Sequence, residues 1–226
     1  IVFGDWSSDV CSSDLVRSAR PYYIEWASEY QALYAHCGGS PEALEMLSAF
    51  DLPDLDQMHS SQYFWRGAGE APHNLYTSTE LLDLALRDRG YLDKTSDYTS
   101  WKFKAEAALA ARPTEEKYIR LDFSSFDYQT EYKYDRATND YLRFNGGVEH
   151  VDALTGNQLR AKNVVVQIVP PSWPLSDKDR IGLDVVGEGK VVIFRDGEII
   201  EGQWNKQDRN GRTLFYDKSG KEIEFS

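Results

Sequence analysis

The sequence predicts an α+β fold, with a helix-rich first part that contains a few strands and an antiparallel β-rich second part. Two observations predict this class. Before Pro113, apolar residues recur at helical spacing behind helix-start signals, whereas from Lys117 onward apolar and polar residues alternate with a period of two. The change of period predicts a boundary near Pro113, so we expect one domain over residues 16–113 and a second over residues 117–226.

The first helix is expected just after the polar segment that ends at Arg20. Pro21 suits the first turn of a helix, and the large apolar residues between Tyr22 and Leu33 mostly fall on one helical face. Residues 32–36 could instead form a short strand, since Gly38-Gly39 follows directly. The sequence leaves the end of this helix open.

Capping signals predict the next helices. Ser40-Pro41-Glu42 has the order of an N-cap, a first-turn proline and a first-turn acid, which predicts a helix from Pro41 to about Phe50. Thr77–Glu80 reads as a capping box for a helix that stops near Gly90. A further helix is expected over Trp101–Ala111 because Pro113 would end it.

The second part is expected to be a series of antiparallel strands. Residues 128–135 alternate aromatic or β-branched side chains with polar ones, which is typical of a half-buried strand. Asp196-Gly197 and Asn210-Gly211 supply the positive φ that tight hairpins need. The expected strands are Tyr118–Ser124, 128–135, Tyr141–Phe144, Asn163–Val169, Lys190–Phe194, Ile199–Trp204, Thr213–Tyr216 and Glu222–Phe225.

Composition argues against several function classes. The 226 residues carry 25 basic and 37 acidic side chains, a formal charge of -12, so a nucleic-acid partner is not expected. The sequence contains no run of 18 apolar residues, so it predicts no membrane-spanning helix. Two cysteines and four scattered histidines give neither a disulfide framework nor the spacing of a metal site. We therefore expect no metal and no cofactor.

The first fifteen residues look foreign to the rest of the chain. They repeat Ser-Ser-Asp at Ser7–Asp9 and Ser12–Asp14 and show no helical or strand periodicity. Asp9–Leu15 can be back-translated into the end of a common sequencing-library adapter. Our hypothesis is that residues 1–15 are a translated adapter and that the native sequence begins at Val16.

One candidate site is an anion pocket in the first part. Guanidinium groups pair with carboxylate or phosphate in a bidentate manner, and backbone N–H groups at a helix start favour an anion. The residues of this candidate pocket are Arg17, Arg20, Gly38, Gly39, Ser40, Arg66, His73, Asn74 and Thr77. The alternative is that the arginines pair with internal acids and that the glycines and caps only form turns.

Other polar groups are weaker candidates. His150 and Asp152 would share one face of an extended segment and could form a second polar site, although a capped loop after Gly146-Gly147 is the favoured interpretation. Tyr128, Tyr132, Tyr134 and Tyr141 could form a platform for a glycan or peptide, but strand aromatics more often fill a core. Ser40 and Ser78 lack a nucleophile-elbow motif and stand at expected N-caps, so no catalytic residue is predicted.

Several strings resemble those of a known family. They are VRSARP at 16–21, HCGGS at 36–40, YFWR at 63–66, PHNLYTSTE at 72–80, YKYD at 132–135, His150-Val151-Asp152 and NVVV at 163–166. In order and spacing they resemble the YerB family of bacterial lipoproteins. The resemblance implies two linked domains of unknown function, held outside the cytoplasmic membrane by a lipidated cysteine. Family members carry a signal segment before these motifs and usually continue further, so we expect this chain to be a fragment that lacks the anchor.

These observations favour a non-enzymatic module of the cell envelope, outside the cytoplasm, that binds an anionic ligand or an unknown envelope protein. Membrane contact would come only through the missing lipid anchor. One alternative is an enzyme that acts on an anionic envelope polymer clamped by Arg17, Arg20 and Arg66, and another is a structural or assembly factor. Gathering of Arg17, His36, His73 and His150 in one cleft would favour the enzyme.

Overall fold

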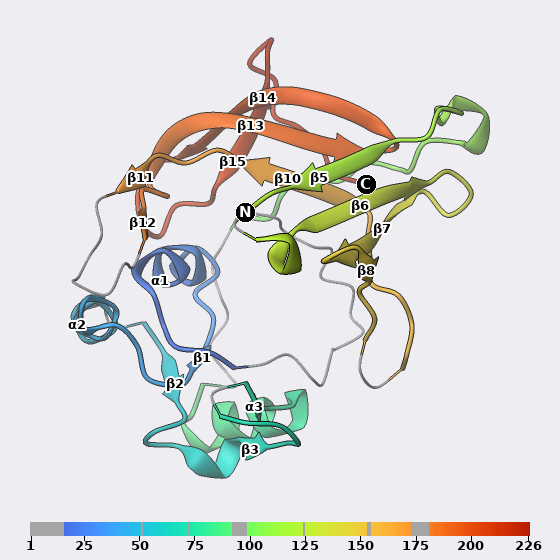
Figure 1. Cartoon of the computed structure of the whole chain (residues 1–226). Coiled ribbons are helices and arrows are strands. Elements are labelled where there is room, and N and C mark those ends of the chain that lie inside the picture. The colour runs from blue at the N-terminus through green and yellow to red at the C-terminus, as the bar shows by residue number, and fades with distance from the viewer. Residues whose placement is uncertain are drawn as a thin grey trace.

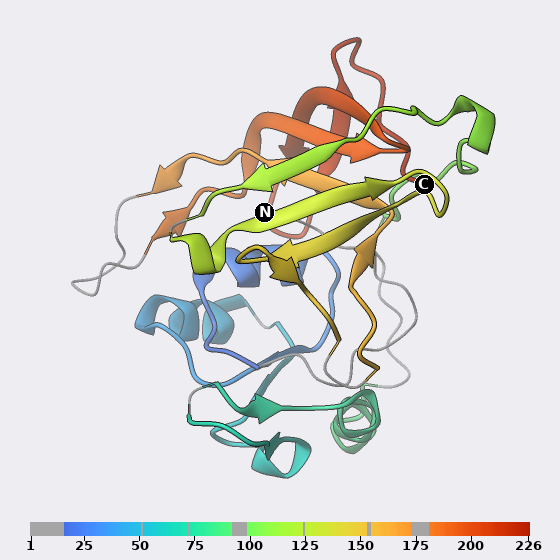
Figure 2. The same ribbon diagram turned by 45° about the vertical axis from the view of Figure 1, so that its right-hand side comes forward.

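The computed structural model describes residues 16–50, 52–71, 73–91, 99–123, 125–152, 155–172 and 181–226. Figures 1 and 2 show three α-helices and short strands in the N-terminal part, and above them two antiparallel sheets in the C-terminal part. The α+β class and the antiparallel second part are thus confirmed. The N-terminal part interleaves its helices with strands rather than being helical throughout. The hypothesis on residues 1–15 lies outside the described residues.

Short strands in the N-terminal part bring its motifs together. Its elements are α1 (Pro21–Ser28), β1 (Tyr34–His36), α2 (Pro41–Phe50), β2 (Asp54–Asp56), η1 (Ser61–Tyr63), β3 (Trp65–Arg66), β4 (Leu75–Tyr76) and α3 (Thr79–Asp88). β1 and β2 are parallel, and β3 and β4 form an antiparallel pair. Residues 16–19 lie between these pairs, because Val16 N donates to Leu75 O (2.9 Å) and Cys37 N donates to Arg17 O (3.0 Å).

The capping signals locate two helix starts. Ser40 Oγ accepts from Ala43 N (3.2 Å), so α2 begins at Pro41 as predicted. At α3 the N-cap is Ser78, as expected, and its side chain accepts from Leu81 N. Thr77 Oγ1 instead donates to the carbonyl of Tyr63 (2.8 Å), which ties the helix start to the end of η1.

The C-terminal part is built from two sheets. One has the order β5 (Tyr118–Leu121), β6 (Thr130–Asp135), β7 (Asp140–Asn145) and β8 (Val148–Glu149), with β9 (Arg160–Ala161) also paired to β7. The other has the order β10 (Asn163–Gln167), β13 (Gly187–Arg195), β14 (Glu198–Lys206) and β15 (Leu214–Asp217). Shorter elements are η2 (Leu109–Ala111), η3 (Phe126–Tyr128), β11 (Pro171–Ser172) and β12 (Gly182–Leu183). Only Lys162 separates β9 from β10, so the chain passes directly from one sheet into the other.

Aromatic side chains fill the space between the sheets. Tyr132, Tyr134 and Tyr141 are buried with Val164 of β10, and Phe194 of β13 packs against them. These tyrosines therefore form core, as the simpler interpretation predicted. Tyr128 differs, because it lies in η3 and is 67% exposed. A second cluster, which includes Trp204 and Phe215, covers the other face of the β10–β15 sheet.

The predicted helix over Trp101–Ala111 is wrong. Only Leu109–Ala111 forms a 3-10 turn, and residues 102–104 run beside the end of the chain, where Lys104 N donates to Phe225 O (2.8 Å) and Phe225 N donates to Lys102 O (2.8 Å). The Trp101 ring packs on Phe215 and Phe225. Burial of this indole and pairing with a segment more than 100 residues away outweigh the local preference for a helix.

The two predicted glycine turns behave differently. Asp196 (φ 53°) and Gly197 (φ 77°) join β13 to β14 as predicted. Asn210-Gly211 does not form a tight hairpin, because β14 and β15 are joined by a longer loop in which Asp208 Oδ1 accepts from both backbone N–H groups of this pair. Residues 222–225 likewise form isolated bridges rather than a full strand.

No helix in the described ranges is long and apolar enough to cross a membrane.

Candidate functional site

Two arginines converge on the start of β4. The Arg17 guanidinium donates to Nδ1 of His73 (2.6 Å), and the Arg66 guanidinium donates to Oδ1 of Asn74 (2.8 Å). The amide nitrogen of Asn74 donates in turn to the carbonyl of Gly69 (3.0 Å), which fixes the orientation of this buried side chain. We call Arg17, Arg66, His73 and Asn74 the arginine cluster. It contains four of the nine predicted pocket residues.

The arginine cluster forms no ion pair among the described residues. Residues 16–91 contain five arginines, no lysine and eleven carboxylates, yet within the described part of the chain neither Arg17 nor Arg66 forms an ion pair. Arg17, Arg66 and His73 are all exposed. The alternative, in which Arg17 and Arg20 pair with internal acids, is likewise not seen among the described residues. Exposed guanidinium groups of this kind are suited to binding an anion.

The predicted helix-start half of the pocket lies beside the arginines but is already saturated. Residue 19 is bridged to residue 39, so the Arg17–Arg20 backbone does lie against Gly38–Ser40. Gly38 N, however, donates to Oδ1 of Asp56 (2.9 Å), and Ser40 N donates to Ala19 O (3.2 Å). Arg20 donates to the carbonyl of Ala19, so its side chain folds back on its own segment. These groups and Thr77 have structural partners, and ligand binding at them stays a prediction.

His36 lies beneath this turn and is 1% exposed. Its Nε2 is 3.0 Å from Oδ2 of Asp54, and its Nδ1 is 2.9 Å from the carbonyl oxygen of Gly38. Burial alone would lower the pKa of His36, but the hydrogen bonds to Asp54 and Gly38 and the nearby Asp56 together raise it. Both neighbours of the ring accept hydrogen bonds, so the arrangement suits an imidazolium rather than a catalytic base.

The second predicted polar site is a loop. His150 N donates to Arg143 O (3.0 Å), which continues the strand pairing after β8. Asp152 Oδ2 accepts from Thr155 N (3.2 Å) and Thr155 Oγ1 (2.8 Å), and therefore holds the turn that leads back to β9. A binding role for His150 and Asp152 stays a prediction. No group of three or more metal-ligating side chains occurs among the described residues.

Comparison with known proteins identifies the family. Residues 12–92 match the family described as "Protein of unknown function (DUF3048) N-terminal domain", and residues 119–226 match the corresponding C-terminal domain. The chain belongs to this family. It is 30% identical over 216 residues to "Putative lipoprotein YerB" of Bacillus subtilis strain 168, which covers 93% of this chain. The resemblance to YerB that the motifs predicted is confirmed.

A solved structure supports the same relationship. The crystal structure of the YerB protein from Bacillus subtilis superposes with a TM-score of 0.78 at 26% identity, covering 93% of this chain and 69% of that one. The chain spans 62% of the length of the curated relative it matches. The expected boundary near Pro113 stays a prediction, although Trp101 and Lys104 contact the DUF3048 C-terminal domain.

A cluster of buried charged residues joins the two DUF3048 domains. No motif in the sequence indicates that these residues are buried or paired. Glu29, just after α1, is 1% exposed and lies 3.2 Å from Nζ of Lys206, which is 0% exposed. Oε2 of Glu29 also accepts from the backbone N–H and the hydroxyl of Thr213 (both 2.7 Å), and Arg212 is 3.5 Å from Oε1. Figure 1 shows α1 as the helix nearest the sheets. Glu29 and Lys206 can be buried because they pair with each other, although 177 residues separate them in the sequence.

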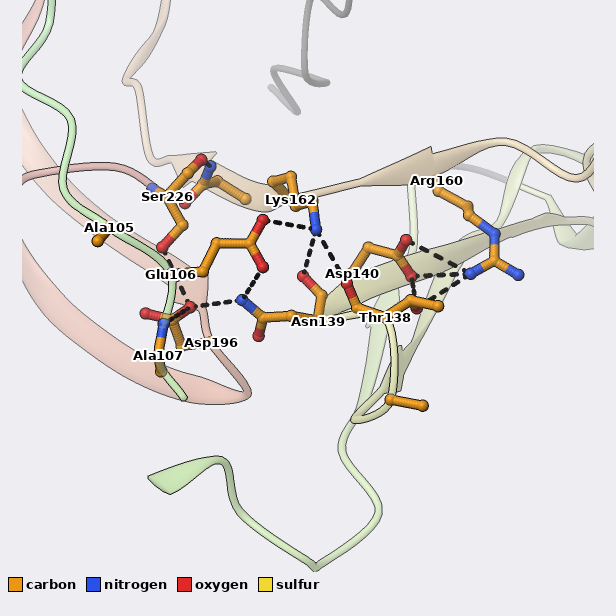
Figure 3. Close-up of polar contacts among 12 residues, drawn as sticks. Ala105, Glu106, Ala107, Thr138, Asn139, Asp140, Arg160, Lys162, Asp196 and Ser226 are labelled. Atoms are coloured by element: carbon orange, nitrogen blue, oxygen red, sulfur yellow. Dashed lines mark hydrogen bonds and ion pairs between the residues drawn. The ribbon is translucent and has the colours of Figure 1, made fainter. Parts of the chain in front are cut away.

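A second polar network holds the sheets of the DUF3048 C-terminal domain together (Figure 3). Oδ1 of Asp196, in the β13–β14 turn, accepts from Nδ2 of Asn139 (2.8 Å) in the β6–β7 turn. Oδ2 of Asp196 pairs with Nζ of Lys104 (2.5 Å). Burial alone would raise the pKa of Asp196, but the hydrogen bonds from Lys104 and Asn139 lower it to about 2. Glu106 links the same amide to Lys162 (2.9 Å). Donors surround Asp196, so this carboxylate is a structural anchor.

Proposed function

We propose that this protein is a non-enzymatic module of the bacterial cell envelope that binds an anionic ligand through the arginine cluster. The observation that carries the proposal is the pair of exposed guanidinium groups, Arg17 and Arg66, for which the described residues of a carboxylate-rich domain provide no carboxylate partner. The Bacillus subtilis relative is described as "Putative lipoprotein YerB", which supports a position outside the cytoplasm.

The hydrogen bonds of the cluster leave it with donors only. Arg17 donates to Nδ1 of His73, so the neutral imidazole carries its proton on Nε2. The one acceptor of the Asn74 side chain is occupied by Arg66, and its amide nitrogen is held by backbone carbonyls. The remaining N–H groups of Arg17, Arg66 and His73 are therefore complementary to the oxygens of a phosphate or carboxylate.

The geometry favours binding over catalysis. An enzyme would be favoured if Arg17 lay in one cleft with His36, His73 and His150. Of these three histidines, His73 is the one whose side chain contacts Arg17. His36 is buried with both ring nitrogens engaged, and His150 belongs to the C-terminal domain. Asp54, the carboxylate nearest to His36, is used to hold that imidazole.

Titration with inorganic phosphate at constant ionic strength tests the proposal. We expect phosphate to shift the Arg17 and Arg66 side-chain N–H signals in NMR spectra, and the double variant Arg17→Gln/Arg66→Gln to weaken binding about tenfold or more. Arg87→Gln is the matched control, because Arg87 is an exposed arginine of the same domain on α3. Equal phosphate binding by the double variant and the control would refute the proposal.

A further inference from the structure

An aromatic pair stands beside the arginine cluster. Trp65 and Tyr76 are directly paired across β3 and β4, and their rings stack with centroids 6.0 Å apart and an interplanar angle of 25°. Trp65 is 41% exposed. A Cβ atom on Gly67 would lie only 2.7 Å from the Tyr76 ring, so the ring packs against a bare backbone that helps to fix its position. The pair is therefore an aromatic surface that is fixed in position and partly exposed to solvent.

The aromatic pair and Arg17 lie on the same face of these strands. Leu75 is buried in the core of the N-terminal domain, so its neighbour Tyr76 and the paired Trp65 project away from that core. Val16 also packs against this core, which turns Arg17 toward the other side. Val16 N is bonded to Leu75 O, and neighbouring strands lie about 4.8 Å apart. Arg17 therefore leaves the segment next to β4 on the same face as Tyr76.

Aromatic rings next to an exposed guanidinium group match a particular ligand chemistry. One face of a pyranose ring presents mainly C–H groups, which lose contact with water when the ring packs on an indole, while polar substituents remain free to bond at the edge. A carboxylate or phosphate on the same sugar would reach the neighbouring guanidinium group. A simple anion would use the arginine but would leave the rings uncovered.

We propose that the ligand of this surface is an acidic saccharide, with its sugar ring on Trp65 and Tyr76 and its anionic group on Arg17. Arg66 is paired with the buried Leu75 and leaves β3 on the opposite face from Trp65, so it is not assigned to the sugar. The inference rests on the proposed anion-binding function and narrows its ligand to one chemical class.

Binding of three small probes to the full chain, followed by calorimetry and by the indole N–H signal of Trp65, tests the inference. The probes are N-acetylmuramic acid, the uncharged N-acetylglucosamine and lactate, which separate the combined ligand into its ring and its carboxylate. We expect the acidic sugar to bind about tenfold or more tightly than either fragment, because it makes both sets of contacts. Equal affinity for N-acetylglucosamine and N-acetylmuramic acid would overturn the inference.

Variants separate this inference from the proposed function. Trp65→Ala should weaken binding of the acidic sugar about tenfold while lactate and phosphate bind unchanged, and Trp65→Tyr should restore most of the loss because it returns an aromatic ring. Phe126→Ala is the matched control, since Phe126 is a 63% exposed aromatic residue of the other domain. Unchanged sugar binding by Trp65→Ala would sink the saccharide inference alone. Loss of phosphate binding only in Arg17→Gln/Arg66→Gln would still uphold the anion site.

Discussion

At the scale of single residues, His36 shows how a buried charge supports a functional turn. Its imidazole bridges Asp54 of β2 and the carbonyl of Gly38, while Asp56 holds the N–H groups of Gly38 and Met58. The turn that leads into α2 is thereby fixed by side chains from the neighbouring parallel strand. Arg17 and Arg20 lie on the other side of this turn. The protonation state of His36 is therefore coupled to the backbone beneath the arginine cluster.

This coupling predicts a pH dependence of stability. The pKa of His36 is raised in the folded state. Its contribution to the free energy of unfolding is therefore complete below the unfolded pKa of about 6.5 and is lost as the pH rises through the folded pKa. The hydrogen bond from His36 lowers the pKa of Asp54, whose contribution is lost only in stronger acid. We expect the melting temperature to fall as the pH rises above about 6.5.

A histidine variant checks this assignment. In His36→Gln the slope of melting temperature against pH above neutrality should flatten, and the free energy of unfolding at pH 6 should drop by about 1–3 kcal/mol because buried acceptors lose a donor. His59→Gln, at an exposed histidine, should keep the slope of the native protein. A titration of the His36 ring by NMR that gave an ordinary or lowered pKa would contradict the assignment.

At the scale of elements, β14 illustrates how close strand packing restricts sequence. It is paired along its length with β13 and over Gly202–Asn205 with β15. A Cβ atom on Gly202 would collide with the carbonyl oxygen of Tyr216 in β15. The nearest atoms all belong to the β15 backbone, so no flexible side chain could give way. Glycine is required at Gly202 because it lets β14 and β15 approach closely, and not because the backbone has a positive φ.

Gly202→Ala should consequently destabilise the C-terminal domain. We expect a loss of at least about 1–3 kcal/mol in the free energy of unfolding, since the added methyl group must push β15 away from β14. Gly211→Ala is a suitable control, because a Cβ atom there would meet its neighbours at 3.4 Å, an ordinary contact distance. Urea unfolding of both variants provides the measurement. Equal midpoints would show that β15 can shift without cost.

At the scale of the whole molecule, Glu29 and Lys206 set how the two domains meet. Burial lowers the pKa of Lys206, and the attraction of Glu29 opposes that shift. Arg209 adds a second link, since its guanidinium lies 3.3 Å from Glu25 of α1 and 3.1 Å from the centre of the Phe50 ring. The loop between β14 and β15 thus packs against α1, which follows Arg17 and Arg20 in the chain.

Glu29→Gln keeps the shape of the side chain but leaves Lys206 and Arg212 without their buried counter-charge. Because breaking a buried ion pair on one side is strongly unfavourable, we expect a loss of roughly 3–5 kcal/mol in the free energy of unfolding. The loss should come with separate unfolding of the two domains, seen as two transitions in urea. Glu45→Gln, at an exposed glutamate of α2, is the control.

A double variant distinguishes the pair from its individual charges. Glu29→Met/Lys206→Met replaces both buried charges with apolar side chains of similar length, and should recover much of the lost stability. A double variant less stable than Glu29→Gln would mean that the ion pair itself, rather than the removal of an uncompensated charge, governs docking.

Local signals in the sequence were sufficient for much of the fold. Ser40-Pro41 located the start of α2, and Asp196-Gly197 located a hairpin, because caps and turns depend on hydrogen bonds within a few residues. The alternation around Tyr132 predicted a strand whose tyrosines are core. The motifs also predicted the family. Two pairs of the predicted pocket residues, Arg17 with His73 and Arg66 with Asn74, are hydrogen-bonded, and their role as a site stays a prediction.

The tertiary structure decided what depends on distant partners. Trp101 is extended because its indole is buried against Phe215 and Phe225, and Asn210-Gly211 forms part of a loop that docks on α1 rather than a tight hairpin. Gly38 offers no free N–H because Asp56, on a parallel strand, accepts from it. The same holds for Glu29 and Lys206, whose charges look like surface charges in the sequence. Burial and long-range hydrogen bonds are properties of the folded neighbourhood, so no short stretch of sequence contains them.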